Sequence, residues 1–369
     1  MQTNRRSWFK QSALLLGALT LDADLFAKEK KIYRPADNKI YLNSNENAYG
    51  PSPLAKQAIL DNYGQTNRYP DDLIDTLKKK IAAHWSVGEE NILMGAGSSE
   101  IIGISLMTAG TKLKKDFLVA DPAYSVWYGQ AAALGYTASP IPVTHDRKYD
   151  LDKMQSRAGY IPPTFVYICN PNNPVGTFIE PDRIKKFAEA LPKESFILID
   201  EAYTEYAGLP TLAAYAISKP NVVVAKTFSK IYGLAGARAG YAIAHPATIK
   251  KLAADQPWPN ANVSRVTVAA AMASLDDTDF VKDCKQKNEQ VRDSCYPVFK
   301  ELQLEYIPSS ANFILFNVTK LKKDLIKEMA AKNIYVQHRE HFGGKWCRVT
   351  VGTEDEMKQF TGALREIVA

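Results

Sequence analysis

The chain has 369 residues, which is long for one compact domain and favours two domains that share an interface. Hydrophobic residues make up 46% and charged residues 23%, which excludes a largely disordered chain. The net charge of +6 is modest, and the densest basic run, Lys112–Lys115, is too thin for a nucleic-acid-binding surface.

The first 27 residues predict an export signal. Arg5 and Arg6 are followed by a short apolar run, residues 13–19. Paired arginines before such a run are typical of a twin-arginine signal, and the run is too short to span a bilayer. We therefore expect a periplasmic or otherwise exported protein with cleavage after Ala27. The alternative is a cytoplasmic protein whose basic leader has no targeting role.

Residues 65–275 are expected to form a large α/β domain in which apolar strands alternate with helices. The strand candidates are Ile92–Met94, Phe117–Ala120, Phe165–Cys169, Phe196–Ile199, Val222–Ala225 and Tyr241–Ala244. Helical patterns lie between several of them, as at Ser125–Leu134 and Pro181–Ala190. This alternation predicts a mainly parallel sheet covered on both faces.

Residues 276–369 are expected to form a smaller α+β domain, on which the N-terminal segment 28–64 packs. The predicted elements are a long polar helix at Thr278–Leu302, strands at Phe313–Phe316, Ile334–Val336 and Arg348–Val351, a helix at Leu321–Ala331 and a terminal helix. The four cysteines have no CxxC spacing, which disfavours a metal site and favours buried apolar side chains. A bond between Cys284 and Cys295 is the alternative.

The first candidate functional motif is Gly95–Glu100, between a predicted strand and a predicted helix. Gly97 followed by Ser98 and Ser99 at a helix start forms a cradle for an anion. Helix capping by either serine is the simpler interpretation and is compatible with the cradle. Tyr124, after the next strand, can stack on a flat ring, although packing is the commoner role of a lone tyrosine.

Two further motifs follow predicted strands. In the turn Asn170–Thr177, Asn173 can donate to the phenolic oxygen of a ring ligand or can simply stabilise the turn. Asp200 ends a strand, where α/β sheets bind ligands, and can keep a pyridine nitrogen protonated so that the ring acts as an electron sink. Asp200 alone would equally fit a helix N-cap. Tyr203 can donate to the same phenolic oxygen as Asn173.

The fourth motif is Thr227–Lys230, followed after two residues by a turn of small residues that ends at Arg238. The hydroxyls of Thr227 and Ser229 and the guanidinium of Arg238 are donors that suit a phosphate. Lys230 beside that phosphate can form a Schiff base with an aldehyde cofactor. Lys230 alone would fit an exposed loop lysine, but the other motifs favour the functional role. The glycines do not match GxGxxG, which disfavours a nicotinamide-dependent enzyme.

Together these motifs resemble the fold-type I pyridoxal-phosphate enzymes, and within them most closely the histidinol-phosphate aminotransferases. The resemblance covers the chain from about Tyr41 to its carboxyl end. It is highly specific for the superfamily and moderately specific for this branch. The matching segments are Leu42–Pro51, Arg68–Asp71, the asparagine turn, the Asp200 and Lys230 motifs, and Arg348–Thr353.

The resemblance implies an α/β fold-type I transferase that forms a homodimer with shared active sites. Tyr69 would reach the cofactor phosphate of the partner subunit, and Tyr49 would line the substrate pocket. Arg348 would bind the carboxylate of a glutamate-type substrate, whereas from spacing alone it would equally fit a charge on a surface strand. Gln337 stands where related enzymes often carry arginine, and Arg339 is expected to substitute for it from the next turn.

The activity implied is a ping-pong transamination with pyridoxal 5'-phosphate. An amino group would move from histidinol phosphate or an aromatic amino acid to 2-oxoglutarate, with Lys230, Asp200 and Tyr203 as catalytic residues. One alternative keeps the cofactor and is a decarboxylase of the threonine-phosphate type. The other is a non-catalytic ligand-binding relative.

Overall fold

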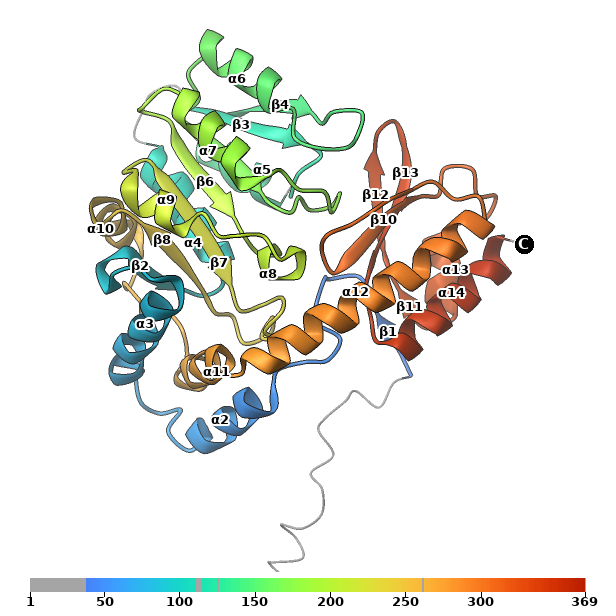
Figure 1. Ribbon diagram of the computed structural model, residues 1–369, viewed down its shortest axis with the longest axis horizontal. Coiled ribbons are helices and arrows are strands. Elements are labelled where there is room, and N and C mark those ends of the chain that lie inside the picture. The colour runs from blue at the N-terminus through green and yellow to red at the C-terminus, as the bar shows by residue number, and fades with distance from the viewer. Residues whose placement is uncertain (1–37, 111–114, 125, 261, 369) are drawn as a thin grey trace, which may run out of the picture. The chain divides into compact units, whose positions relative to one another are not determined.

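The computed structural model describes residues 38–110, 115–124, 126–260 and 262–368, and the part from Ile40 onward forms one compact unit (Figure 1). The predicted export signal, residues 1–27, lies outside the described residues. No helix in the described part of the chain is long and apolar enough to cross a membrane.

A seven-stranded sheet organises the first two thirds of this unit. In spatial order its strands are β2 (Ile92–Gly95), β8 (Gly240–Ala244), β7 (Val222–Thr227), β6 (Phe196–Asp200), β5 (Phe165–Cys169), β3 (Lys115–Asp121) and β4 (Tyr136–Pro142). Only β8 runs antiparallel to its neighbours. The central strands are buried along their whole length, as a sheet covered on both faces requires. The predicted mainly parallel α/β sheet is thereby confirmed.

Helices connect these strands. They are α2 (Pro53–Tyr63), α3 (Asp71–Trp85), the 3-10 turn η1 (Glu89–Asn91), α4 (Ser98–Ala109), α5 (Val126–Ala133), α6 (Leu151–Tyr160), α7 (Pro181–Ala190), α8 (Thr204–Ala207), α9 (Ala213–Ser218), α10 (Pro246–Asp255) and α11 (Arg265–Asp276). Side-chain caps fix several starts, because Ser52, Asp150 and Ser264 each accept from a backbone N–H of the first turn.

A smaller antiparallel sheet lies in the last quarter of the chain, in the order β12 (Gln337–His341), β13 (Gly344–Thr350), β10 (Phe313–Asn317) and β9 (Tyr306–Ile307). The other elements there are α12 (Thr278–Glu301), α13 (Leu325–Ala331), β11 (Ile334–Tyr335) and α14 (Glu354–Val368). The long helix α12 contacts both α8 and α14, and so links the two sheets (Figure 1).

The N-terminal segment divides between the two regions. β1 (Ile40–Tyr41) pairs in parallel with β11, as expected for a segment that packs on the smaller domain. α2, which was expected to do the same, packs against α11 instead. Small residues allow this close approach, since Ala55 of α2 is fully buried and α11 contains a run of three alanines, residues 269–271.

Three details differ from the expected elements. The helix expected at Leu321–Ala331 begins only at Leu325, because Asp324 caps it by accepting from two backbone N–H groups. Arg339 lies on β12 rather than in a turn. Cys284 and Cys295 are free and buried. Both lie on α12, where eleven residues of helical rise separate them by about 16 Å, too far for a disulfide.

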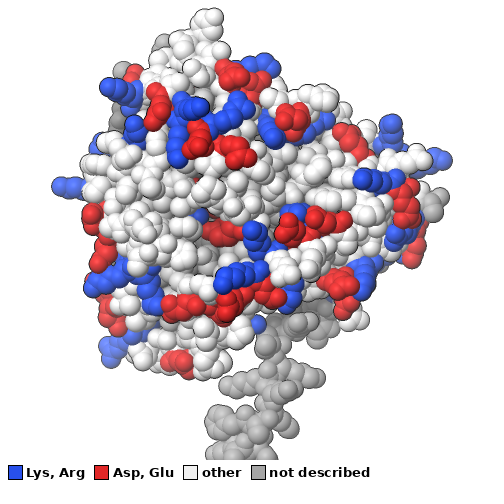
Figure 2. Space-filling model, in the orientation of Figure 1, with Lys and Arg blue, Asp and Glu red and all other residues white. Residues whose placement is uncertain are grey.

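Charged side chains of both signs are interspersed on the face shown in Figure 2. Exposed ion pairs among the described residues include Lys80 with Asp276 at 2.6 Å and Lys287 with Asp283 at 2.6 Å. Exposed pairs of this kind contribute little to stability.

Candidate active site

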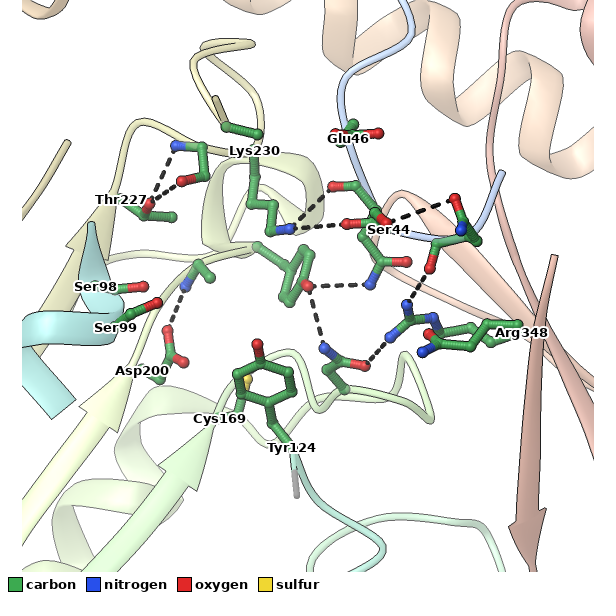
Figure 3. A pocket seen from close by; sticks show the side chains of 18 of the residues that line it. Ser44, Glu46, Ser98, Ser99, Tyr124, Cys169, Asp200, Thr227, Lys230 and Arg348 are labelled. Atoms are coloured by element: carbon green, nitrogen blue, oxygen red, sulfur yellow. Dashed lines mark hydrogen bonds between the residues drawn. The ribbon is translucent and has the colours of Figure 1, made fainter. Parts of the chain in front are cut away.

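A cavity of about 350 Å³ lies at the carboxyl ends of β5, β6 and β7 (Figure 3). The segment 43–46 and the strands β12 and β13 close it from the other side. Most of the predicted site residues line this cavity, namely Ser98, Ser99, Tyr124, Asn173, Asp200, Tyr203, Thr227, Ser229, Lys230, Arg238, Arg339 and Arg348. Residues from five separate motifs are therefore brought together.

Lys230 projects into the cavity from the loop after β7 (Figure 3). Its Nζ donates to the carbonyl oxygens of Ser44, at 3.3 Å, and Asn45, at 3.1 Å. Burial lowers the pKa of the amine to about 8, and the positive charge of Arg348 acts in the same direction. A larger fraction of this amine is therefore neutral and nucleophilic near neutral pH than in an exposed lysine.

Asp200 is buried at the end of β6, with 3% of its surface exposed. Its Oδ2 accepts from the Tyr167 hydroxyl at 2.8 Å, and its Oδ1 accepts from the Ala202 N–H at 3.1 Å. Burial raises the pKa of Asp200 to about 6, although both hydrogen bonds act in the opposite direction. The carboxyl group is thus fixed in direction and needs a cationic or N–H partner in the cavity to hold its charge.

A chain of hydrogen bonds crosses the cavity from Tyr203 to Arg348. The Tyr203 hydroxyl accepts from Asn45 Nδ2 at 3.1 Å and from Asn173 Nδ2 at 3.3 Å. Asn173 Oδ1 in turn accepts from Arg348 Nη1 at 2.8 Å, and Arg348 Nη2 donates to the Asn43 carbonyl at 2.8 Å. This arrangement leaves the Tyr203 O–H proton available for a ligand oxygen.

An anion cradle lies beside Lys230. Arg238 donates from Nη1 to Ser229 Oγ at 3.4 Å and from Nη2 to Ser99 Oγ at 3.3 Å. Thr227 Oγ1 donates to Ser229 Oγ at 2.9 Å. Gly97, directly before α4, has φ +82°, and a Cβ there would lie 2.5 Å from Arg238 Nη2. Hydroxyls, a guanidinium and a helix N-terminus converge here, which is the donor set that a phosphate requires.

The wall formed by β12 and β13 carries Gln337, Arg339 and Arg348. Arg348 is 4% exposed, and burial lowers its pKa to about 10. Within the described residues, Arg348 Nε and Gln337 Oε1 are buried atoms without a hydrogen-bond partner. Such atoms are costly unless something satisfies them, and a ligand in the cavity can do so. The alternative that Arg348 is a charge on a surface strand is excluded.

Two predicted site residues lie away from the cavity. Tyr49 is not among the residues that line it, and the Lys287 ammonium lies 5.1 Å from its ring centroid. Tyr69 is 66% exposed, and its ring packs on Trp258 at 4.9 Å between centroids. Neither side chain lines the cavity of this chain.

Tyr167 and the role of Asn45 were not predicted from the sequence. Tyr167 lies in a strand read only as apolar, and nothing in that pattern shows which side chain faces Asp200. Asn45 belongs to the matched segment Leu42–Pro51, but its bond to Tyr203 joins residues 158 positions apart.

Cys169 also lines the cavity, and burial raises the pKa of its thiol. Among the described residues, no group of three or more His, Cys, Asp or Glu could hold a metal ion.

The chain is similar in sequence to proteins of one known family. The sequence profile described as aminotransferase class I and II matches residues 37–364. A histidinol-phosphate aminotransferase of Moorella thermoacetica is 36% identical over 339 residues, covering 89% of this chain and 86% of that protein.

Solved structures agree with this match. The histidinol-phosphate aminotransferase of Sinorhizobium meliloti, in complex with pyridoxal-5'-phosphate, superposes with a TM-score of 0.81 at 29% identity, covering 89% of this chain and 90% of that chain. The L-threonine-O-3-phosphate decarboxylase of Porphyromonas gingivalis reaches 0.76 at 20% identity, covering 89% and 98%, which shows a shared fold alone. The motif residues line the cavity, and the family profile matches nearly all of the described residues. The chain therefore belongs to the aminotransferase class I and II family.

Proposed function

We propose that this protein is a pyridoxal-phosphate-dependent aminotransferase. The observation that carries the proposal is the placement of the Lys230 amine, with its pKa lowered to about 8, in one cavity with the buried Asp200 carboxyl group and the cradle around Arg238. An amine, a carboxylate and an anion site so arranged match the three polar ends of pyridoxal phosphate: its aldehyde, its ring nitrogen and its phosphate.

The residues present fit this cofactor. A Cβ at position 97 would clash with the Arg238 guanidinium. Because Gly97 has none, the cradle has room for a phosphate. Asp200 needs the partner that a protonated ring nitrogen offers. The residues that would hold the cofactor are Gly97, Ser98, Ser99, Thr227, Ser229 and Arg238 at the phosphate, Asp200 at the ring nitrogen, Asn173 and Tyr203 at the phenolic oxygen, and Tyr124 against the ring.

When bound, the cofactor supplies an aldehyde and a protonated ring that together act as the electron sink for loss of the substrate α-proton. Lys230 would be the general base that takes this proton and the acid that gives it back, which suits an amine with a lowered pKa. Asp200, directed by Tyr167, holds the proton on the ring nitrogen. Tyr203 and Asn173 orient the ring oxygen, and Arg348 is placed to bind a substrate carboxylate.

We further propose histidinol phosphate or an aromatic amino acid as donor and 2-oxoglutarate as acceptor. The Moorella relative is a histidinol-phosphate aminotransferase, which supports the first donor. Arg339 and Arg348 on the cavity wall support an anionic substrate at both half-reactions, because each guanidinium can bind a carboxylate or phosphate.

An absorbance titration tests the proposal. Purified protein reconstituted with pyridoxal phosphate is mixed separately with histidinol phosphate, each aromatic amino acid, glutamate and threonine phosphate. We expect the yellow band of the Lys230-bound cofactor to convert to the amine form, fastest with the physiological donor. Release of carbon dioxide without a keto product would establish the decarboxylase instead. A protein that forms no yellow band contradicts the assignment of Lys230 and leaves a ligand-binding role.

We also propose a homodimer in which Tyr69 serves the partner's cofactor phosphate. Exposed apolar side chains support an interface on this side, since Leu54, Leu60 and Tyr63 on α2 and Trp258 beside Tyr69 are each at least 48% exposed. Sedimentation measurements that give a monomer at micromolar concentration would contradict it.

Export by the twin-arginine route is proposed from Arg5, Arg6 and the apolar run that follows. That route carries folded proteins, so the cofactor can be loaded before transport. Cell fractionation of the protein and of a variant with both arginines replaced by lysine tests it. We expect periplasmic protein only from the unaltered sequence, and equal distributions would contradict the route.

A further inference from the structure

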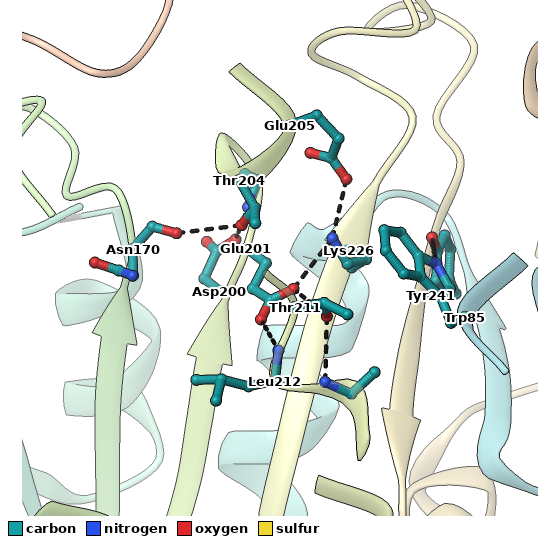
Figure 4. Close-up of polar contacts among 12 residues, drawn as sticks. Trp85, Asn170, Asp200, Glu201, Thr204, Glu205, Thr211, Leu212, Lys226 and Tyr241 are labelled. Atoms are coloured by element: carbon teal, nitrogen blue, oxygen red, sulfur yellow. Dashed lines mark hydrogen bonds and ion pairs between the residues drawn. The ribbon is translucent and has the colours of Figure 1, made fainter. Parts of the chain in front are cut away.

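Three charged side chains, two buried and one partly exposed, form a cluster (Figure 4) and do not line the cavity. Lys226 Nζ lies 2.9 Å from Glu205 Oε1 and 3.1 Å from Glu201 Oε2. Lys226 is 1% exposed and Glu201 is 3% exposed, whereas the Glu205 side chain is 16% exposed. We call Lys226, Glu201 and Glu205 the triad.

Glu201 and Lys226 of the triad make further contacts with neighbouring groups. Glu201 accepts from Thr211 Oγ1 and from the Leu212 N–H, both at 2.7 Å. The Lys226 ammonium lies 4.1 Å from the Trp85 ring centroid, a cation–π contact. Burial acts to lower the pKa of Lys226, but Glu205 and Glu201 outweigh it and raise the pKa, so this amine stays charged. Lys226 thus differs from Lys230, whose pKa is lowered.

The triad joins the two segments that carry the candidate catalytic groups. Glu201 directly follows Asp200, and Glu205 lies two residues after Tyr203, at the start of α8. Lys226 directly precedes Thr227 in β7. The backbone holds the same junction, because the Glu201 N–H donates to the Ala225 carbonyl at 2.9 Å. One ammonium group therefore fixes both ends of the 201–205 segment against the strand that leads to Lys230.

We propose that Lys226 is a positioning residue for the reaction: through Glu201 and Glu205 it holds the Asp200–Tyr203 segment in register with the Lys230 loop, so that both sides of the cofactor are held in one orientation. The inference rests on the proposed function. Lys226 does not line the cavity and would act on cofactor orientation only through these neighbours.

Stability alone does not account for the triad. Removing the charges of Lys226 and Glu201 from water is unfavourable, and well-packed apolar side chains commonly hold a core equally well. Charged hydrogen bonds differ from apolar contacts in that they fix direction as well as proximity. A displacement of about 1 Å at a reacting centre can reduce the rate by about a hundredfold, so fixed direction at this junction matters for the chemistry.

The test compares Lys226→Met, Lys226→Arg and a control, Arg157→Met. Arg157 forms a partly buried ion pair with Asp116 at 2.9 Å, outside the cavity. For each holoenzyme we would measure the ellipticity of the visible cofactor band per unit of its absorbance, which reports cofactor orientation. The same proteins give the melting temperature, and kcat and KM for the fastest donor with α-hydrogen and α-deuterium.

We expect Lys226→Met to lose at least half of the normalised ellipticity, to lower kcat about tenfold with KM changed less than twofold, and to raise the deuterium isotope effect. Lys226→Arg should restore most of each loss, because a guanidinium can pair with both carboxylates. Arg157→Met should lower the melting temperature and leave ellipticity and kcat unchanged. Should Lys226→Met not fold, Glu205→Gln, which leaves the pair of Lys226 with Glu201, is expected to show a smaller loss in the same direction.

Two results would overturn the inference. One is wild-type ellipticity and kcat in Lys226→Met or, where that variant does not fold, in Glu205→Gln. The other is an equal loss in Arg157→Met, which would reduce the triad to general stability. A wild-type protein that forms no cofactor band would instead overturn the proposed function, and the positioning role with it.

Discussion

Lys230 and Arg348 share one cavity, and the charge of Arg348 acts on the pKa of Lys230. Burial is the main cause of the lowered pKa of Lys230, and the Arg348 charge is the next. Arg348 itself is held by Asn173 and Asn43, so its charge cannot move away when the cavity is empty. The residue that is placed to bind the substrate carboxylate therefore also tunes the amine that acts as base.

This coupling predicts how cofactor loading depends on pH. Only the neutral amine attacks an aldehyde, so the loading rate of the cofactor-free enzyme should rise with pH and level off above about 8. In Arg348→Gln one of the charges that lowers the pKa is gone, so the midpoint should move to higher pH while staying below that of an exposed lysine. Stopped-flow absorbance after mixing with pyridoxal phosphate measures both profiles.

The control for this prediction is Arg157→Gln, which removes a guanidinium outside the cavity and should leave the midpoint unchanged. An Arg348→Gln midpoint equal to that of the wild type would mean that burial alone sets the pKa of Lys230. A midpoint that moves to lower pH would contradict the electrostatic argument altogether.

At the residue scale, the sequence predicted the groups that sit at strand ends. Asp200 and Lys230 follow apolar strands, and the carboxyl ends of parallel strands meet at one edge, so their proximity followed from position. Tyr167 and Asn45 could not be found this way. Tyr167 matters because it faces Asp200 from the neighbouring strand, and Asn45 because it contacts Tyr203, 158 positions away. A single sequence carries no information on such contacts.

The start of α4 is the element on which the anion cradle depends. Gly97 has φ +82°, a conformation that other residues adopt only with strain, and an added Cβ would displace the Arg238 guanidinium. Gly97→Ala should therefore weaken pyridoxal-phosphate binding by about tenfold, equivalent to about 1.4 kcal/mol, and lower the melting temperature. Equilibrium dialysis and thermal unfolding measure the two effects.

Gly159→Ala is the matched control. Gly159 lies inside α6, a Cβ there meets nothing within 4 Å, and alanine is the better helix former by about 1 kcal/mol. We expect an unchanged dissociation constant and an equal or higher melting temperature. Wild-type cofactor affinity in Gly97→Ala would show that the phosphate binds elsewhere.

Elements with strong apolar patterns were predicted almost to the residue, and weakly patterned ones were missed. The expected helix at Pro181–Ala190 is α7 itself, and the expected strand at Phe165–Cys169 is β5. β4 contains two prolines and was not recognised, because proline is compatible with a strand only at the edge of a sheet, where β4 lies.

The hairpin of β12 and β13 was not predicted from the sequence, for a different reason. β12 is polar throughout, and its two-residue turn is Phe342–Gly343, in which both residues have positive φ. The usual sequence signal for such a turn is Asn-Gly or Asp-Gly, which is absent here. Arg339 was consequently expected in a turn, although its position on the cavity wall was anticipated.

At the scale of the whole molecule, the family and the sheet were predictable but the completeness of the site was not. The motifs lie in chain order from Tyr41 to the carboxyl end, and the topology gathers them into one cavity. Tyr49 and Tyr69 do not line that cavity, and Tyr69 is also largely exposed. If it serves the partner's cofactor, each active site requires two chains, and this can be tested by mixing defective subunits.

Lys230→Ala and Tyr69→Ala chains, carrying different tags, would be co-expressed and the mixed dimer isolated. If Tyr69 acts across the interface, one site in the mixed dimer has both defects and the other is fully native. The native site takes its Lys230 from the Tyr69→Ala chain and its Tyr69 from the Lys230→Ala chain. We then expect roughly half of the wild-type kcat per dimer, well above either parent homodimer. If Tyr69 acts within its own chain, neither site is native. The mixed dimer would then show no more than half the activity of the Tyr69→Ala homodimer, and the shared-site arrangement would be wrong.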